Sequence, residues 1–97
     1  MNDVTLRLRA RALEWRLVEG EVIAIDGDTS QYLGVNGSGA LLWQRLADGS
    51  TRAGLVAVLV SSFALEAEQA EADVDAFLSS LEENQLLEHD PADGPTG

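Results

Sequence analysis

The sequence predicts an α+β fold, in which a three-stranded antiparallel sheet is followed by three helices. Two patterns in the 97-residue chain support this fold class. Up to residue 35, apolar and polar residues alternate as they do in half-buried strands, and from residue 40 onward apolar residues recur with a helical period. We expect one domain, because a chain of this length buries only about three-fifths of its unfolded surface and supports a single core.

The first part of the chain contains one extended segment and three expected strands. Val4, Leu6 and Leu8 alternate with polar residues, which is typical of a half-buried extended segment. The strands are expected at residues 13–17, 21–25 and 31–35. Glu19-Gly20 and the turn residues 26–30 separate them, and such short connections predict an antiparallel meander.

Three helices are expected at residues 40–47, 51–62 and 67–84. Ser50 or Thr51 caps the second helix, which is apolar on nearly all sides and is therefore expected to lie deepest in the core. The third helix carries apolar residues on one face and acidic residues on the other. Leu86 and Leu87 close the core, which predicts a domain over residues 1–88 and a disordered polar tail over residues 89–97.

The charge excludes two classes of partner. The chain has seventeen Asp and Glu, six Arg and no Lys, for a net charge of −11, and residues 53–97 contain ten acids and no base. A phosphate backbone or an anionic membrane surface requires Lys and Arg, so we expect no nucleic-acid and no membrane partner. No apolar run reaches the length of a membrane span and the N-terminus lacks a signal-peptide core, which indicates a soluble, cytoplasmic protein.

The sequence offers no arrangement of residues that is typical of a catalytic site. The chain has no Cys, and its one His, His89, lies near the C-terminus, so neither a metal site nor a Ser-His relay is expected. The glycines of residues 34–39 match no phosphate-binding loop, and the acids of the third helix form a solvated face. We therefore expect no catalytic residue, no metal and no cofactor. Trp15 and Trp43 are expected in the core.

The segment Gln31–Val35 is the main candidate for a partner surface. Edge strands are normally protected by Lys, Pro or bulges, and this segment has none of them. Gly34 allows another backbone to approach closely. Two interpretations stay open: the strand is central or covered by a helix, or it is an open edge to which an extended peptide adds. Tyr32 fits the core and the rim equally well.

Several short motifs occur in a fixed order along residues 6–88. They are Trp15, the segment 20–23, Tyr32 before Val35-Asn36, Gly39 before Leu42-Trp43, Asp73-Val74, Phe77-Leu78 and Leu86-Leu87. In this order and spacing they resemble the PqqD-like family, which is named for accessory protein D of pyrroloquinoline quinone synthesis. The family is also called the RiPP recognition element, after the ribosomally made and post-translationally modified peptides that it serves.

The resemblance implies a winged-helix-like fold and a non-catalytic adaptor. Such an adaptor binds the leader segment of a precursor peptide by strand addition and presents it to a modifying enzyme such as a radical-SAM protein, a peptidase or a cyclase. In the family the leader lies between the third strand and the third helix. Carried onto this chain, the implied peptide-binding residues are Gln31, Tyr32, Leu33, Gly34, Val35, Asp73, Val74, Phe77, Leu78 and Leu81.

The chain departs from the family at the end of the third helix. Family members usually have a glycine before the closing leucines, and this chain has Gln85. We expect Asn84 to adopt the left-handed conformation in its place.

Two alternatives use the same fold or the same strand. A winged-helix nucleic-acid-binding regulator also has strands and three helices, but the absence of bases after Arg52 argues against it, and a gel shift at low salt tests it. An open strand edge also allows self-pairing, so a homodimer is a second use of this edge. From the sequence, Val35→Pro is the natural test of the edge, because it removes one N–H from the strand.

Overall fold

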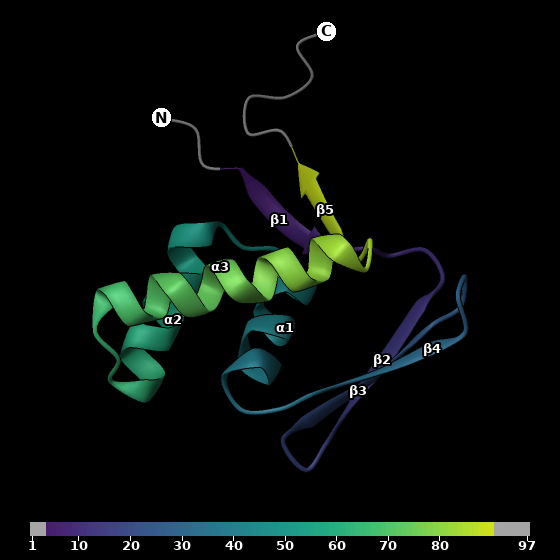
Figure 1. Ribbon diagram of the computed structural model, residues 1–97, viewed down its shortest axis with the longest axis horizontal. Helices are drawn as coiled ribbons and strands as arrows, with labels where there is room; N and C mark the ends of the chain where they lie inside the picture. The colour runs from purple at the N-terminus through teal and green to yellow at the C-terminus, as the bar shows by residue number, and fades with distance from the viewer. Residues whose placement is uncertain (1–3, 91–97) are drawn as a thin grey trace, which may run out of the picture.

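The computed structural model describes residues 4–90, which form three helices, a three-stranded sheet and a two-stranded sheet (Figure 1). In chain order the elements are β1 (Thr5–Leu8), β2 (Leu13–Val18), β3 (Glu21–Asp26), β4 (Gln31–Val35), α1 (Ser38–Asp48), α2 (Arg52–Phe63), α3 (Ala67–Glu83) and β5 (Leu87–Asp90). The predicted α+β fold is confirmed. Among these helices, none combines the length and the apolar composition that crossing a membrane requires.

The three-stranded sheet is the predicted antiparallel meander, with β3 in the centre. One of its faces lies toward α1. Val22 and Ala24 on this face are buried, and Trp15 meets the buried Trp43 of α1 edge to face, with ring centroids 6.1 Å apart. On the opposite face the Tyr32 side chain is 74% exposed. The sheet is therefore half-covered, which explains its alternating sequence.

The core is built mainly on α1. Its buried residues are Ala40, Leu42, Trp43 and Leu46. The expectation that the second helix lies deepest is wrong, because only Leu55 and Leu59 of α2 are buried, while Val60 and Phe63 are 37% and 44% exposed. A helix that is apolar all round has no sequence signal for the face that meets the core. Trp15 is also more exposed than expected, at 36%.

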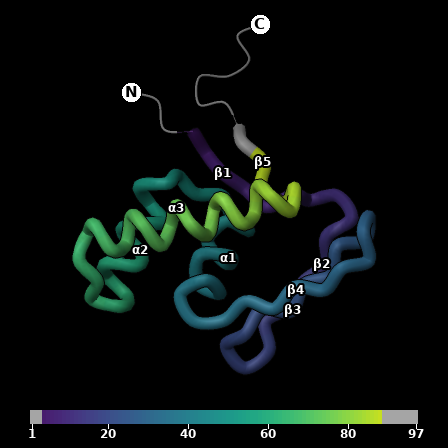
Figure 2. The backbone as a smooth tube through the Cα atoms, viewed as in Figure 1, coloured from purple at the N-terminus to yellow at the C-terminus, as the bar shows by residue number. Residues whose placement is uncertain are grey.

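The chain ends meet in a second, small sheet. Strand β5 pairs antiparallel with β1, from Leu8↔Leu87 to Thr5↔Asp90, and Figure 2 shows the two strands side by side above α3. Glu88, His89 and Asp90 therefore belong to a strand, which corrects the expected start of the tail at residue 89. Their polar sequence resembles a tail, but backbone hydrogen bonds to β1 do not depend on side-chain type. The rest of the predicted tail lies outside the described residues.

Helix α3 ends in a Schellman motif on Gln85. The N–H of Leu86 donates to the carbonyl of Leu81 and the N–H of Gln85 to that of Glu82, at 2.9 and 3.0 Å. Gln85 has the positive φ of 60°, whereas Asn84 has a φ of −95°. The expectation for Asn84 is therefore wrong: in this hydrogen-bond pattern the residue after the helix cap must be left-handed, and that residue is Gln85.

We expect Gln85→Gly to stabilise the protein. A left-handed conformation costs a residue with a Cβ atom about 1 kcal/mol, and glycine removes this cost while keeping both hydrogen bonds of the motif. Urea unfolding should show a gain of about 0.5–1 kcal/mol. Asn84→Gly is the control, because residue 84 has an ordinary φ and should lose stability. If the free energy of unfolding changed in the same direction for both variants, Gln85 would not be the left-handed residue of the motif.

Candidate functional site

Strand β4 lies at the edge of the three-stranded sheet, and among residues 4–90 it pairs only with β3. The hairpin between β2 and β3 decides which of its backbone groups point outward. The two-residue turn Glu19-Gly20 has φ values of 52° and 83° and is closed by the pair Val18↔Glu21. In such a turn the residue after the turn donates its N–H back to the residue before it, so the N–H of Glu21 points toward β2.

The N–H and C=O groups of successive strand residues point alternately to the two sides of the strand. Because Glu21 points toward β2, Val22 and every second residue after it point toward β4. Their register partners, the odd-numbered residues of β4, point back toward β3. The backbone groups of Tyr32 and Gly34 therefore point to the open side, and no hydrogen bond within residues 4–90 reaches them. Strand β4 is thus an open edge and not a central strand, and the addition of a peptide to it stays a prediction.

A small pocket lies beside the first half of this edge. Its lining comes from all three strands of the sheet and from the end of α3: Leu13, Ala24, Asp26, Gln31, Tyr32, Leu33, Asn84 and Leu86. Apolar side chains make up half of this lining. The pocket is narrow and partly apolar, and it lies next to β4 on the inner face of the sheet.

Gly39 brings the other end of β4 close to α3. A Cβ atom on Gly39 would lie 2.7 Å from Cγ1 of Val35 and 3.6 Å from Cε1 of Phe77. The missing side chain therefore lets the start of α1, the end of β4 and the middle of α3 meet at one point. The sequence analysis placed Gly39 in a loop before a helix and in a family motif, but not in a close contact between β4 and α3, so this role was missed.

The helix residues that the family resemblance implied separate into two groups. Val74 and Leu81 are buried in the core, at 0% and 2% exposure, and neither lines the pocket beside β4. Phe77 and Leu78 are partly buried against the core, and Phe77 is the one that lies near Val35. Asp73 is half-buried and accepts a hydrogen bond from Nε2 of Gln69, at 2.9 Å. The structure thus brings Phe77 to the strand.

Sequence reasoning missed several residues that line the pocket. Leu13 comes from β2, Asn84 caps α3, and Leu86 lies between α3 and β5. Leu86 was recognised as a core residue, but no sequence signal placed it next to Leu33. The position of Leu86 depends on the Schellman turn, which leads the chain from α3 into β5.

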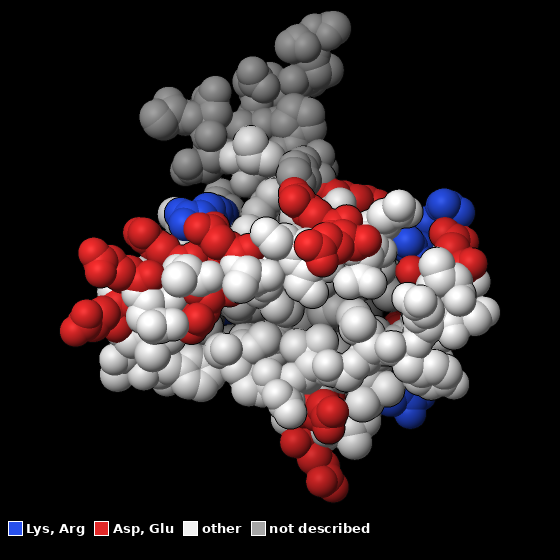
Figure 3. Space-filling view, in the orientation of Figure 1, with Lys and Arg blue, Asp and Glu red and all other residues white. Residues whose placement is uncertain are grey.

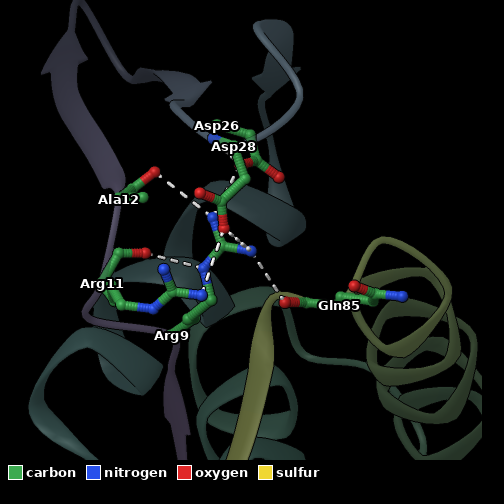
Figure 4. A network of polar contacts seen from close by, with 6 residues as sticks. All are labelled: Arg9, Arg11, Ala12, Asp26, Asp28 and Gln85. Atoms are coloured by element: carbon green, nitrogen blue, oxygen red, sulfur yellow. Dashed lines mark hydrogen bonds and ion pairs between the residues drawn. The ribbon is translucent and has the colours of Figure 1, made fainter.

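A network around Arg9 holds this end of the site together (Figure 4). The Arg9 guanidinium donates to the Asp26 carboxylate at 2.6 Å and to the carbonyls of Arg11, Ala12 and Gln85 at 2.8, 3.3 and 3.3 Å. Its side chain and that of Asp26 are only 12% and 11% exposed. The guanidinium therefore joins the segment before β2, the end of β3 and the segment after α3.

A comparison with known protein families identifies the family of this chain. The description that matches is Coenzyme PQQ synthesis protein D (PqqD), over residues 21–87. The chain belongs to the PqqD family. The matched part of this PqqD-family protein runs from β3 into β5 and includes β4 and all three helices. The comparison with curated proteins found no match.

Two solved structures resemble this PqqD-family chain. One is TbiB1 in complex with the TbiA(beta) leader peptide, with a TM-score of 0.78 and 23% identity over 84% of this chain and 94% of that chain. The other is lasso peptide synthetase B1 complexed with the leader peptide, with a TM-score of 0.75 and 31% identity over 86% of this chain and 96% of that chain. Both likenesses extend over most of the present fold.

Arg9 controls the charge state of one carboxyl at this end of the candidate site. Its hydrogen bond holds the pKa of the Asp26 carboxyl below the ordinary value of 3.8, and the N–H of Asp28, which also donates to Asp26, acts in the same direction. At the far side of α3, Arg52 lowers the pKa of Asp75 in an exposed pair. Among residues 4–90, no group of three or more His, Cys, Asp and Glu side chains could hold a metal ion.

We expect amide hydrogen exchange to follow the alternation along β4. The amides of Tyr32 and Gly34 should exchange at least about tenfold faster than those of Leu33 and Val35, because only the latter are bonded to β3. NMR-detected exchange on the monomeric protein, with its size checked by light scattering, measures all four. Equal protection of the four amides would show that the edge is covered.

The Arg9–Asp26 pair should make stability depend on pH. Because the folded-state pKa of Asp26 is lowered, its carboxylate stabilises the fold above the ordinary value of 3.8, and this contribution is lost as the pH falls through the folded-state value. Asp26→Asn should therefore lower the urea midpoint at pH 7 and approach the wild-type midpoint near pH 3. Asp75→Asn is the control, because its pair is exposed and contributes little. A loss for Asp26→Asn that is the same at both pH values would contradict this account.

Proposed function

We propose that this protein is a non-catalytic adaptor that binds the leader segment of a ribosomally made precursor peptide and presents it to a separate modifying enzyme. The leader adds to β4 as a further strand of the sheet. The observation that carries this proposal is the open edge of β4, where Tyr32 and Gly34 direct two N–H and two C=O groups away from the sheet beside a partly apolar pocket. Strand addition to such an edge is a common mode of peptide recognition.

The comparisons support the same mode. Both similar structures are complexes with leader peptides, and the lasso peptide synthetase B1 chain is 31% identical to this one. Within the described residues, the site contains backbone groups, apolar side chains and carboxylates that are paired or exposed, which suits binding better than bond chemistry. The modifying enzyme is of the radical-SAM, peptidase or cyclase type that the family resemblance implies.

The backbone groups alone do not supply enough affinity. Micromolar binding needs about −8 kcal/mol. As hydrogen bonds, the four edge groups contribute on the order of 1 kcal/mol each. Together they supply about half of the binding free energy that micromolar affinity needs. Side chains of the leader must therefore be buried as well, and we expect the narrow pocket lined by Leu33 and Leu86 to widen and take one of them. The adaptor thus combines a sequence-independent edge with a selective pocket.

Tyr32→Pro tests strand addition directly. It removes an N–H that points to the open side, so the bonds between β4 and β3 stay intact, and proline is tolerated on edge strands. Tyr32→Ala is the matched control, because it removes the same ring and keeps the N–H. We expect Tyr32→Pro to weaken leader binding by roughly 2- to 12-fold beyond Tyr32→Ala, the value of one hydrogen bond.

Calorimetry measures this effect, with synthetic leader segments of the short open reading frames that neighbour the gene as probes. Circular dichroism checks that both variants are folded. Equal affinity of the two variants for a leader that the wild type binds would place the peptide elsewhere. No binding of any such segment to the wild type would contradict the adaptor function itself.

A further inference from the structure

The surface beside β4 is uncharged in its middle and acidic around it. Figure 3 shows a white band between α3 and the sheet, with acidic side chains over α3 and at the hairpin between β2 and β3. The acids of α3 include Asp73 and Glu83, and those of the hairpin are Glu19 and Glu21. A peptide that lies along β4 therefore has negative charge on both of its sides.

The arginines near this surface offset that charge only in part. Arg16 of β2 is exposed and lies on the same face of the sheet as Glu21 and Gly34, because it pairs with Ile23, which pairs with Gly34.

The other arginines near this surface are paired with acids. Arg9 is bound to Asp26, Arg11 lies 3.4 Å from Asp28, and Arg52 lies 2.7 Å from Asp75. Arg9 is the only basic residue that lines a pocket beside β4 in the described part of the chain. The field along the edge thus favours a positively charged peptide, and at a net charge of −11 a second copy of this chain is a poor occupant.

One carboxylate lies directly at the open edge. Oε2 of Glu21 is 3.3 Å from the position that a Cβ atom on Gly34 would occupy. Glu21 and Gly34 lie on the exposed face of the sheet, since Gly34 pairs with Ile23, two residues after Glu21. Glu21 makes no ion pair within residues 4–90. Because Gly34 has no side chain, nothing separates this carboxylate from a strand added beside β4.

The geometry of strand pairing places one peptide side chain beside this carboxylate. Residues directly across from each other in neighbouring strands have their side chains on the same face, with Cβ atoms about 4.5–5.5 Å apart. This holds for parallel and for antiparallel addition. The peptide residue across from Gly34 therefore projects onto the exposed face, and a side chain as long as Lys or Arg reaches over Gly34 to Glu21.

We propose that the peptide accepted by β4 is cationic, and that a Lys or Arg directly across from Gly34 pairs with Glu21. This inference rests on the proposed function and names the charge class of its peptide. Glu21 is a specificity-determining residue, since it sets which side chain is accepted at one position of the added strand.

The test is a selection of displayed random 12-residue peptides on the immobilised full chain at low salt. It is run on the wild type, on Glu21→Lys and on Glu19→Lys, and Tyr32→Pro is used to discard peptides that do not use the edge. Glu19→Lys is the matched control, because it changes the net charge by the same amount at the turn, away from Gly34. Circular dichroism checks the fold of each variant.

We expect the peptides selected on the wild-type protein to carry Lys or Arg at one fixed position. The peptides selected on Glu21→Lys should carry Asp or Glu at that position instead. For an enriched basic peptide, Glu21→Lys should raise the dissociation constant about 2- to 30-fold, as expected for reversing one exposed ion pair, and clearly more than Glu19→Lys. High salt should reduce the difference between the two variants.

Three results would overturn the proposal. Neutral or acidic peptides that depend on the Tyr32 N–H would reject the charge class and leave the adaptor function standing. Equal effects of Glu21→Lys and Glu19→Lys would reject the contact with Glu21. If no peptide depends on the Tyr32 N–H, or if the chain dimerises with the Tyr32 and Gly34 amides protected, the adaptor function fails together with this inference.

Discussion

The hydrogen bonds of one partly buried guanidinium hold the two halves of this molecule in register. Arg9 donates to Asp26 at the end of β3 and to the carbonyl of Gln85 after α3, and its own backbone N–H donates to Leu86 at 2.7 Å. These contacts position the end of the helix against the sheet. Because the pocket beside β4 is lined from both of these parts, its shape depends on the Arg9 network.

A turn outside β4 determines which backbone groups of β4 point away from the sheet. The turn at Glu19-Gly20 sets the hydrogen-bond phase of β3, and the register between β3 and β4 passes that phase on to Tyr32 and Gly34. The outward residues also have their side chains on the exposed face of the sheet. In the proposed complex, a strand added to the edge would meet the pocket on the inner face and Tyr32 and Glu21 on the outer face.

Local sequence patterns predicted the strands and helices of the candidate site well, but they predicted poorly which of their residues are buried in the core. Strand Gln31–Val35 has its predicted bounds, and Phe77 lies near its end beside Gly39, while the role of Phe77 in peptide binding stays a prediction. Val74 and Leu81 are absorbed by the core instead. The helix period identifies an apolar stripe, but which part of the stripe stays accessible depends on the neighbouring elements. The sequence also could not show which N–H groups of β4 point outward. Val35→Pro is therefore a poor test of the edge, since the N–H of Val35 points toward β3.

The amino-acid sequence by itself determined the α+β class, the order of the elements, the acidic character and the family, because local periodicity, turn residues, charge and short motifs carry that information. Only the tertiary structure decided that β5 pairs with β1, that Gly39 lets Val35 approach Phe77, and that Glu21 lies beside Gly34. Backbone pairing between segments some 80 residues apart leaves no local pattern, and a missing side chain has meaning only when the atoms that occupy its place are known.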